Sequence, residues 1–350
     1  KTDLYMKNKK LLWFFVALIL SALTIFTIFK SSGLSFQDFV YNIKNASLIW
    51  LLAAIACTIL FIFFEGESIV QILKGLGLKA KHRRGFLYSA ADIYFSSITP
   101  SASGGQPASA FFMLKDGFSA PAVTVSLILN VTMYTISIIV LGISTLIFFP
   151  FYFKDFPLLG EIVIIFGIVM LAFLVTGFVL ILKHQSIIMR LGNFAIKILN
   201  KIHLKKEAER LQNKLESLVA NYNQCIRVIA GKKKILIKVF FLNFLQRISQ
   251  ILITVFSYFA LHGDISKGLN VFAIQAYVVL GSNFIPVPGA IGISEYLMLC
   301  GYMLLMNEES AYNLAILSRG ISFYTCITIS IITVLFGYIM TRYKARLNSK

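Results

Sequence analysis

The chain has 350 residues, of which 58% are hydrophobic and 14% are charged, and its formal net charge is +18. Soluble domains average about 45–50% apolar and about 25% charged residues, so this composition excludes an ordinary soluble protein. The apolar residues fall in long blocks, several of them without any charge, and this pattern predicts an all-α integral membrane protein.

Six of these blocks are long enough to be full transmembrane helices, because a helix crosses the hydrocarbon with about 20 apolar residues. The first block is longer than the apolar core of a signal peptide and no small-residue cleavage site follows it, so we expect a retained span. The expected spans are Leu11–Phe29, Leu48–Leu73, Ala120–Phe148, Leu159–Leu182, Ile235–Leu261 and Tyr312–Thr341.

Two further apolar segments, Phe86–Leu114 and Leu269–Met306, are each interrupted near the middle by helix-breaking residues. Their apolar arms have only about 13–17 residues, which is short for a full span. We therefore expect about six full transmembrane helices plus two re-entrant helical hairpins, or eight apolar segments in all. The alternative is that Pro and Gly only kink ordinary spans, which gives eight full crossings.

The breaks themselves are rich in Pro, Gly and Ser. Backbone amides and carbonyls must be paired in hydrocarbon, so unwound chain at this depth implies a polar cavity. Free N–H groups and the N-terminus of a following helix favour anions such as phosphate. The residues expected at this polar cavity are Pro100, Ser101, Ser103, Gly104, Gly105 and Gln106 in the first break, and Pro286, Pro288, Gly289, Gly292, Ser294 and Glu295 in the second.

The distribution of basic residues predicts how the chain is oriented. With the N-terminus inside and six full crossings, 27 of the 33 Lys and Arg residues fall in inside segments and four fall outside. Cytoplasmic loops are enriched in Lys and Arg. We therefore expect a multi-pass membrane protein with both termini in the cytoplasm. The charge then indicates attraction to the anionic inner leaflet rather than a nucleic-acid partner.

The order span, span, hairpin, span occurs in residues 11–149 and again, upside down, in residues 159–341. Inverted repeats of this kind recur in transporters, whose broken helices meet near the membrane midplane. We predict a single polytopic membrane domain, residues 1–350, made of two inverted repeats whose breaks meet at one site.

Residues 183–234 form the longest predicted segment outside the membrane, and they are basic, amphipathic and expected in the cytoplasm. Apolar residues recur there at helical spacing with Arg and Lys between them, which predicts a helix lying on the inner leaflet and a second amphipathic helix after it. The apolar residues of the first helix are Ile187, Ile188, Leu191, Phe194 and Ile198.

Several ionisable residues lie inside apolar segments, where a charge is costly and usually faces a cavity or a partner. Arginines suit a phosphate, carboxylates suit a cationic group, and two of the acids are candidates for coupling to protons. The alternative is structural ion pairing, for example between Arg319 and Glu295. The expected cavity residues are Asp92, Arg247, Arg319 and Glu295, and the candidate coupling acids are Glu65 and Glu67.

No motif indicates catalysis. The chain lacks a Walker A loop, an H-E-x-x-H motif and a G-x-S-x-G motif. Its four cysteines have no metal-ligand spacing and are expected to be packing residues. We therefore expect no catalytic residue, no cofactor and no metal site.

Both breaks nevertheless resemble a known family. The stretch from Pro100 to Pro107 is similar to the P-x-x-x-G-G-[EQ]-P element of the lysylphosphatidylglycerol synthase transmembrane (flippase-like) family. The stretch from Pro286 to Glu295 is similar to that family's P-x-P-G-x-[IL]-G-x-x-E element, and Arg319 matches an Arg common in its last span. Gln106 stands where Glu is frequent in the family.

The resemblance implies a membrane lipid translocator that moves a phospholipid such as lysylphosphatidylglycerol, or a related polyprenyl lipid, between the leaflets of a bacterial plasma membrane. The lipid headgroup would then occupy the polar cavity at the two breaks. In bifunctional members this membrane domain is linked to a cytosolic lysyltransferase, which we do not expect here because only nine residues follow Thr341. One alternative is phosphatidylglycerol lysyltransferase activity in resistance to cationic antimicrobial peptides. Another is a non-transporting partner of a lipid or glycan synthase. Membrane phospholipids are the expected partners, and a homo-oligomer is left open.

Overall fold

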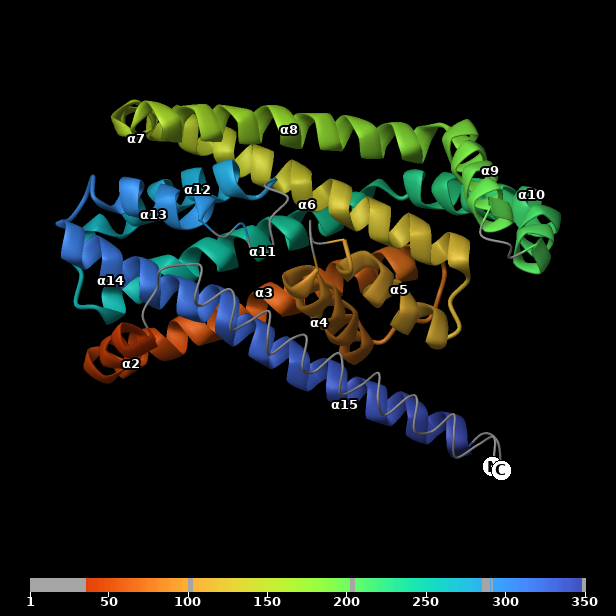
Figure 1. Ribbon diagram of the computed structural model, residues 1–350, viewed down its shortest axis with the longest axis horizontal. Coiled ribbons are helices and arrows are strands. Elements are labelled where there is room, and N and C mark those ends of the chain that lie inside the picture. The colour runs from red at the N-terminus through yellow and green to blue at the C-terminus, as the bar shows by residue number, and fades with distance from the viewer. Residues whose placement is uncertain (1–35, 100–102, 202–204, 285–289, 291, 348–350) are drawn as a thin grey trace.

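The computed structural model describes residues 36–99, 103–201, 205–284, 290 and 292–347 (Figure 1). Within these ranges all regular secondary structure is helical, as the composition predicts. The long helices run mainly along the longest axis of the molecule, and short helices fill the space between them (Figure 1).

Five helical segments are long and apolar enough to cross a membrane, so the protein is a multi-pass membrane protein. The shortest of them has 26 residues and reaches about 39 Å, more than the hydrocarbon thickness of about 30 Å. They coincide with five of the six predicted spans, whereas Leu11–Phe29 lies outside the described residues. The segments are α3 (Leu48–Gly75), α6 (Ala120–Phe148), α8 (Leu158–Lys183), α11 (Lys233–Ala260) and the run Glu308–Met340.

The last of these runs is not one regular helix. It consists of α14 (Glu308–Arg319), the π-helical turn η4 (Gly320–Thr325) and α15 (Cys326–Leu347). Single π turns inside α-helices are often found at functional sites. This turn directly follows Arg319, one of the predicted site residues.

Two pairs of shorter helices correspond to the predicted hairpins. The first pair is α4 (His82–Ile98) and α5 (Gly105–Lys115), and the second is α12 (Gly268–Ser282) and α13 (Ile293–Tyr302); the two helices of each pair pack against each other. The longest has 17 residues, about 25 Å, and is too short to cross the hydrocarbon alone. The re-entrant placement of the hairpins stays a prediction.

Small helices complete the fold. Asn42 donates a hydrogen bond to Asn313 Oδ1 at 3.1 Å, so the helix before α3 is tied to α14. The sequence analysis did not predict any of these short helices. They are α2 (Phe36–Asn45), α7 (Pro150–Asp155) and the 3₁₀ turn η2 (Ile265–Lys267).

The two hairpins lie toward opposite ends of the molecule. In Figure 1 the pair α4–α5 lies toward the end that carries α9 (Gln185–Lys201) and α10 (Lys205–Ala230), while α12–α13 lie toward the end that carries α7. The described helix ends that flank the two breaks therefore lie toward the middle of the molecule. This is the arrangement that a site shared by both breaks requires.

A charged clasp closes the first hairpin. Arg84 in the first turn of α4 donates from Nε and Nη2 to the two carboxylate oxygens of Asp116, each at 2.5 Å. Tyr88 donates to the same carboxylate. Because Asp116 directly follows α5, these contacts hold the open ends of the two helices together.

A close helix contact places the first hairpin against α3. A Cβ added to Gly85 of α4 would lie 2.5 Å from the carbonyl oxygen of Gly66 in α3, so only glycine fits at this distance. Small residues at such contacts let the backbones of membrane helices approach each other. The contact brings the next turn of α4, with Ser89, directly beside Glu65.

Helix α8 shows how the outer surface is built for lipid. Its buried residues recur at helical spacing, as in Ile164, Gly167 and Leu171, and pack toward α6 and α12. Its opposite face exposes large apolar side chains such as Val169 and Phe173. An exposed apolar face is costly in water but suits a helix surrounded by lipid chains.

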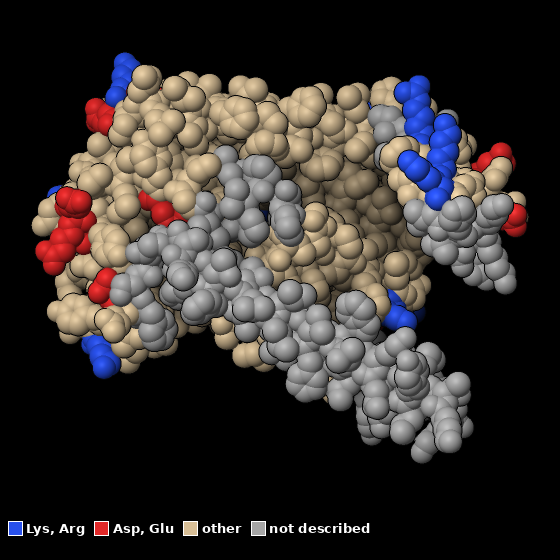
Figure 2. All heavy atoms as spheres, viewed as in Figure 1, with Lys and Arg blue, Asp and Glu red and all other residues tan. Residues whose placement is uncertain are grey.

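Helices α9 and α10 lie at one end of the molecule, where Figure 2 shows a group of Lys and Arg side chains. Phe194 and Ile198 of α9 are exposed, as a helix on a lipid surface requires. Tyr222 of α10 donates to the carbonyl of Ile181 at 3.1 Å and ties this end to α8. Burial raises the pKa of Tyr222 to about 12, so its hydroxyl stays a donor at neutral pH.

Candidate functional site

A cavity of about 520 Å³ lies between the two hairpins and brings both breaks together. Gln106 contributes from the start of α5, and Asn283 and Ala290 contribute from the second break. The charged side chains in its wall are the predicted residues Glu65, Asp92, Arg247 and Arg319.

The first break supplies a hydrogen-bonded acid. Gln106 Nε2 donates to Asp92 Oδ2 at 2.5 Å, and Ser96 donates to Asp92 Oδ1 at 3.1 Å. A Cβ on Gly105 would meet Asp92 and Ser96, so glycine at this position lets α5 begin against the side of α4. The Gly-Gly-Gln sequence therefore places the side-chain amide of Gln106 on the buried carboxylate of Asp92, beside the first break.

A second acid lies beside the first. Glu65 Oε2 accepts hydrogen bonds from Ser89 at 3.1 Å and from Gln246 at 2.9 Å. The carboxyl groups of Glu65 and Asp92 are also within hydrogen-bonding reach of each other. Three helices, α3, α4 and α11, thus meet at a pair of buried carboxyl groups.

Arg247 on α11 is the buried cation of the cavity, with only 6% of its surface exposed. Its guanidinium stacks on Tyr134, with Cζ 4.2 Å from the ring centroid, and donates to Gln250 at 2.7 Å. Its Nε has no hydrogen-bond partner, and in the described part of the chain no carboxylate forms an ion pair with it. Asn283 of the second break donates to Tyr134 at 2.7 Å, which links that break to Arg247.

Arg319 is paired, in contrast to Arg247. Its Nε lies 2.8 Å from Glu295 Oε1, which is the ion pair considered in the sequence analysis. The other oxygen, Glu295 Oε2, accepts from the backbone N–H of Gly292 at 2.7 Å and from Ser294 at 2.9 Å, and so caps the start of α13. Glu295 therefore anchors the second break to α14, while Arg319 still lines the cavity together with Phe323 of η4.

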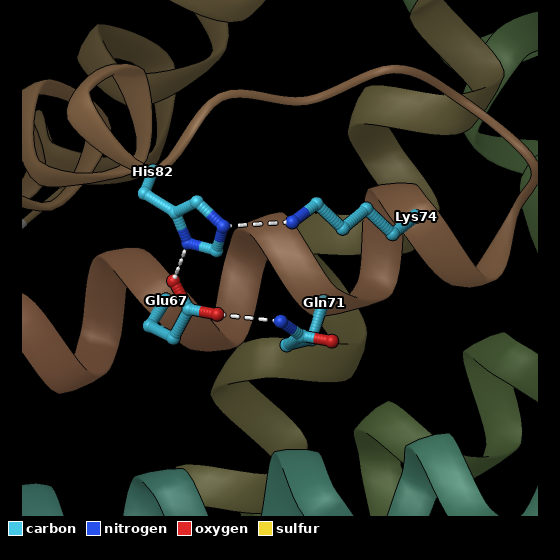
Figure 3. Close-up of polar contacts among 4 residues, drawn as sticks. All are labelled: Glu67, Gln71, Lys74 and His82. Carbon is cyan, nitrogen blue, oxygen red and sulfur yellow. Dashed lines mark hydrogen bonds and ion pairs between the residues drawn. The ribbon is translucent and has the colours of Figure 1, made fainter.

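Glu67 lies away from the cavity, on another face of α3 (Figure 3). It contacts His82 at the start of α4 and accepts from Gln71 at 2.5 Å, and Lys74 approaches the other ring nitrogen of His82 at 2.9 Å. Of the two candidate coupling acids, only Glu65 lines the cavity.

The remaining predicted residues divide into two groups. Ser103, Gly104, Gly292 and Ser294 lie beside the breaks but outside the cavity wall. The other five lie outside the described residues, and they are Pro100, Ser101, Pro286, Pro288 and Gly289.

Sequence reasoning missed several polar residues around the cavity. The sequence analysis did not single out Gln246, Tyr134 or Asn283. Gln246 directly precedes the predicted site residue Arg247, Tyr134 lies in an apolar span, and Asn283 lies just before the second break. A buried cluster of Ser68, Asn130 and Asn243 was missed in the same way. Ser68 donates to Asn130 at 2.6 Å, and Asn243 donates to Ser68 at 2.8 Å, so these hydrogen bonds join α3, α6 and α11.

The cavity can bind a group of mixed polarity. An anion can approach Arg247, where a donor is free, and hydroxyl or amine groups can approach the carboxyl pair and Gln106. Among the described residues no group of three or more His, Cys, Asp or Glu side chains could hold a metal ion. The chemistry of the wall is therefore that of polar recognition within an apolar helix bundle.

Comparisons with known proteins give one result. A family model described as "Lysylphosphatidylglycerol synthase TM region" matches residues 14–330 and so includes both breaks and every residue of the cavity wall. The comparison with curated proteins finds no match.

Proposed function

We propose that this chain, which belongs to the lysylphosphatidylglycerol synthase TM-region family, is a lipid translocator. The family is named after a membrane lipid. The protein moves a phospholipid such as lysylphosphatidylglycerol, or a related polyprenyl lipid, between the leaflets of a bacterial plasma membrane. The lipid headgroup enters the cavity, and its acyl chains stay in the bilayer.

The observation that carries this proposal is the buried position of Arg247 in the cavity wall, without an ion pair among the described residues. A buried arginine at membrane depth costs several kcal/mol unless it is compensated, and among the described residues no carboxylate lies within ion-pair distance of Arg247. A phosphate diester is the anion that lipids carry, and guanidinium groups bind phosphate with two parallel hydrogen bonds. The free Nε and the aromatic support from Tyr134 leave Arg247 preorganised for such a partner.

The two breaks supply the rest of the headgroup site. Gln106 and the carboxyl pair accept and donate hydrogen bonds, so they suit glycerol hydroxyls or an amine. The second break reaches Arg247 through Asn283 and Tyr134. If the halves are inverted repeats, rocking one against the other exposes this site to each leaflet in turn.

The proposal includes an orientation. Both termini lie in the cytoplasm, the first hairpin enters from the cytoplasmic side, and the second enters from outside. Helices α9 and α10 then lie at the anionic inner leaflet, where the group of basic side chains in Figure 2 supports this placement. The oligomeric state is not part of the proposal.

Reconstitution tests this function directly. Purified protein in vesicles with fluorescent phosphatidylglycerol in both leaflets is expected to speed loss of inner-leaflet fluorescence when an impermeant quencher is added outside. Arg247→Gln should slow this exchange by about tenfold or more, because a charge-assisted hydrogen bond to phosphate is worth about 1.5–3 kcal/mol. The matched control is Arg83→Gln, at an exposed arginine outside the cavity, which should exchange lipid at the wild-type rate.

Two outcomes would count against translocation. Exchange no faster than in protein-free vesicles, for phosphatidylglycerol and lysylphosphatidylglycerol alike, contradicts the proposal. Formation of lysylphosphatidylglycerol from lysyl-tRNA and phosphatidylglycerol by the purified chain would instead favour the lysyltransferase alternative.

A further inference from the structure

Glu65 and Asp92 form a buried acid pair that the proposed phosphate contact at Arg247 does not itself involve. Both carboxyl groups line the cavity and lie within hydrogen-bonding reach of each other. Neutral donors surround the remaining oxygens: Ser89 and Gln246 on Glu65, and Ser96 and Gln106 on Asp92. Two carboxylates this close in a buried site cannot both be ionised, so the pair retains a shared proton.

The charges facing this pair make the cavity close to neutral. With one proton shared, the pair carries one negative charge, and Arg247 supplies one positive charge. Arg319 and Glu295 neutralise each other. The other titratable groups of the cavity wall, Tyr134 and Cys326, are ordinarily neutral. His82, Lys74 and Glu67 face away from the cavity in the separate cluster of Figure 3.

We propose that the pair of Glu65 and Asp92 takes up a second proton when a lipid phosphate binds at Arg247, so that lipid and proton enter the cavity together. This inference rests on the proposed function and names its coupling ion. A phosphate diester brings one negative charge into a site that was neutral, and a proton on the acid pair restores neutrality. The proton comes from water on the side to which the cavity is open and returns to water when the lipid leaves.

Linkage fixes the sign of the effect. Because the lipid-bound state holds one more proton than the free state, lipid and proton raise each other's affinity by the same factor. Raising the pH therefore weakens lipid binding, by up to about tenfold per pH unit for one linked proton. A pH gradient that is acidic on one side would drive lipid away from that side.

Proton uptake on binding is the direct test. Short-chain phosphatidylglycerol is added to the purified full chain in weakly buffered solution with a pH indicator, and lipid binding is measured in parallel. The wild type is expected to take up about one proton per bound lipid. Glu65→Gln and Asp92→Asn together imitate the pair with both protons bound, so this double variant should still bind the lipid at Arg247 while uptake falls close to zero. Glu67→Gln, the same change two residues along α3 and outside the cavity, should keep the wild-type uptake.

The outcomes separate this inference from the proposed function. Lipid binding by the wild type without proton uptake, or full uptake by the double variant, overturns the acid-pair coupling and leaves lipid binding standing. No phosphatidylglycerol binding by any variant at any pH overturns the proposed function, and the coupling with it. If the double variant does not fold, the wild-type uptake decides the question: about one proton per bound lipid supports the coupling, and no uptake overturns it.

Discussion

The contact between α3 and α4 at Gly85 provides a sharp test of how the cavity is built. In Gly85→Ala the new Cβ would lie 2.5 Å from the Gly66 carbonyl oxygen and 2.6 Å from Val70 Cγ2, about 0.9 Å inside the ordinary contact distance of 3.4 Å. The helices must separate, and overpacking of this kind costs about 1–3 kcal/mol. Alanine gains about 1 kcal/mol in helix propensity. We therefore expect a net loss of up to about 2 kcal/mol, and a stability about 1–3 kcal/mol below that expected from helix propensity alone.

Stability can be measured by titration of the detergent-solubilised protein with sodium dodecyl sulfate, following helix content. The matched control is Gly177→Ala in α8, where no atom lies within 4 Å of the added Cβ. That variant should be as stable as the wild type or slightly more stable. A second readout is lipid exchange, which should slow in Gly85→Ala because Ser89 and Asp92 move away from Glu65.

Equal stability of Gly85→Ala and Gly177→Ala would refute this reasoning. It would mean that α4 does not approach α3 closely, and that the acid pair is not held by the glycine contact. A large loss of stability with normal lipid exchange would separate packing from function at this position.

Three other predictions concern the hairpins and the polar core. Asp116→Asn should cost about 1–2 kcal/mol in the same titration, because it removes the charge that Arg84 contacts with two hydrogen bonds; no change would show that the clasp is not formed. Ser68→Ala should cost about 1 kcal/mol by leaving two buried asparagines with fewer partners, and a neutral result would place water there. In a chain without native cysteines, a single Cys at Lys115 should react with an impermeant reagent only from the cytoplasm, and one at Glu308 only from outside. The reverse pattern at either position contradicts the re-entrant hairpins.

The spans were predictable because few backbone structures are stable in lipid. Ala120–Phe148 is a helix with the predicted bounds, and Leu159–Leu182 differs from α8 by one residue at each end. An apolar run of this length with at most one charged residue has few alternatives to a helix in hydrocarbon. The π turn Gly320–Thr325 was not predictable in this way, since its apolar composition is compatible with an ordinary α-helix.

The site was predictable in kind but not in detail. Buried charges and breaker residues indicated Asp92, Gln106 and Arg247, and the structure brings them to one cavity. Glu65 and Glu67 were treated alike, although residues two apart on a helix point to different faces and cannot both line the same wall. Which glutamate lines the cavity depends on how α4 packs against α3 at Gly85, and such tertiary contacts are not visible in a single sequence.

The central claim is that the cavity holds a phosphate-bearing lipid at Arg247. Native mass spectrometry of the purified protein tests it most directly, by weighing the lipid that stays bound and identifying it by fragmentation. The account predicts one phospholipid or polyprenyl phosphate per chain in the wild type and in Arg83→Gln, and its loss in Arg247→Gln. Equal retention of the same lipid by Arg247→Gln, or a bound lipid without phosphate, would contradict the account.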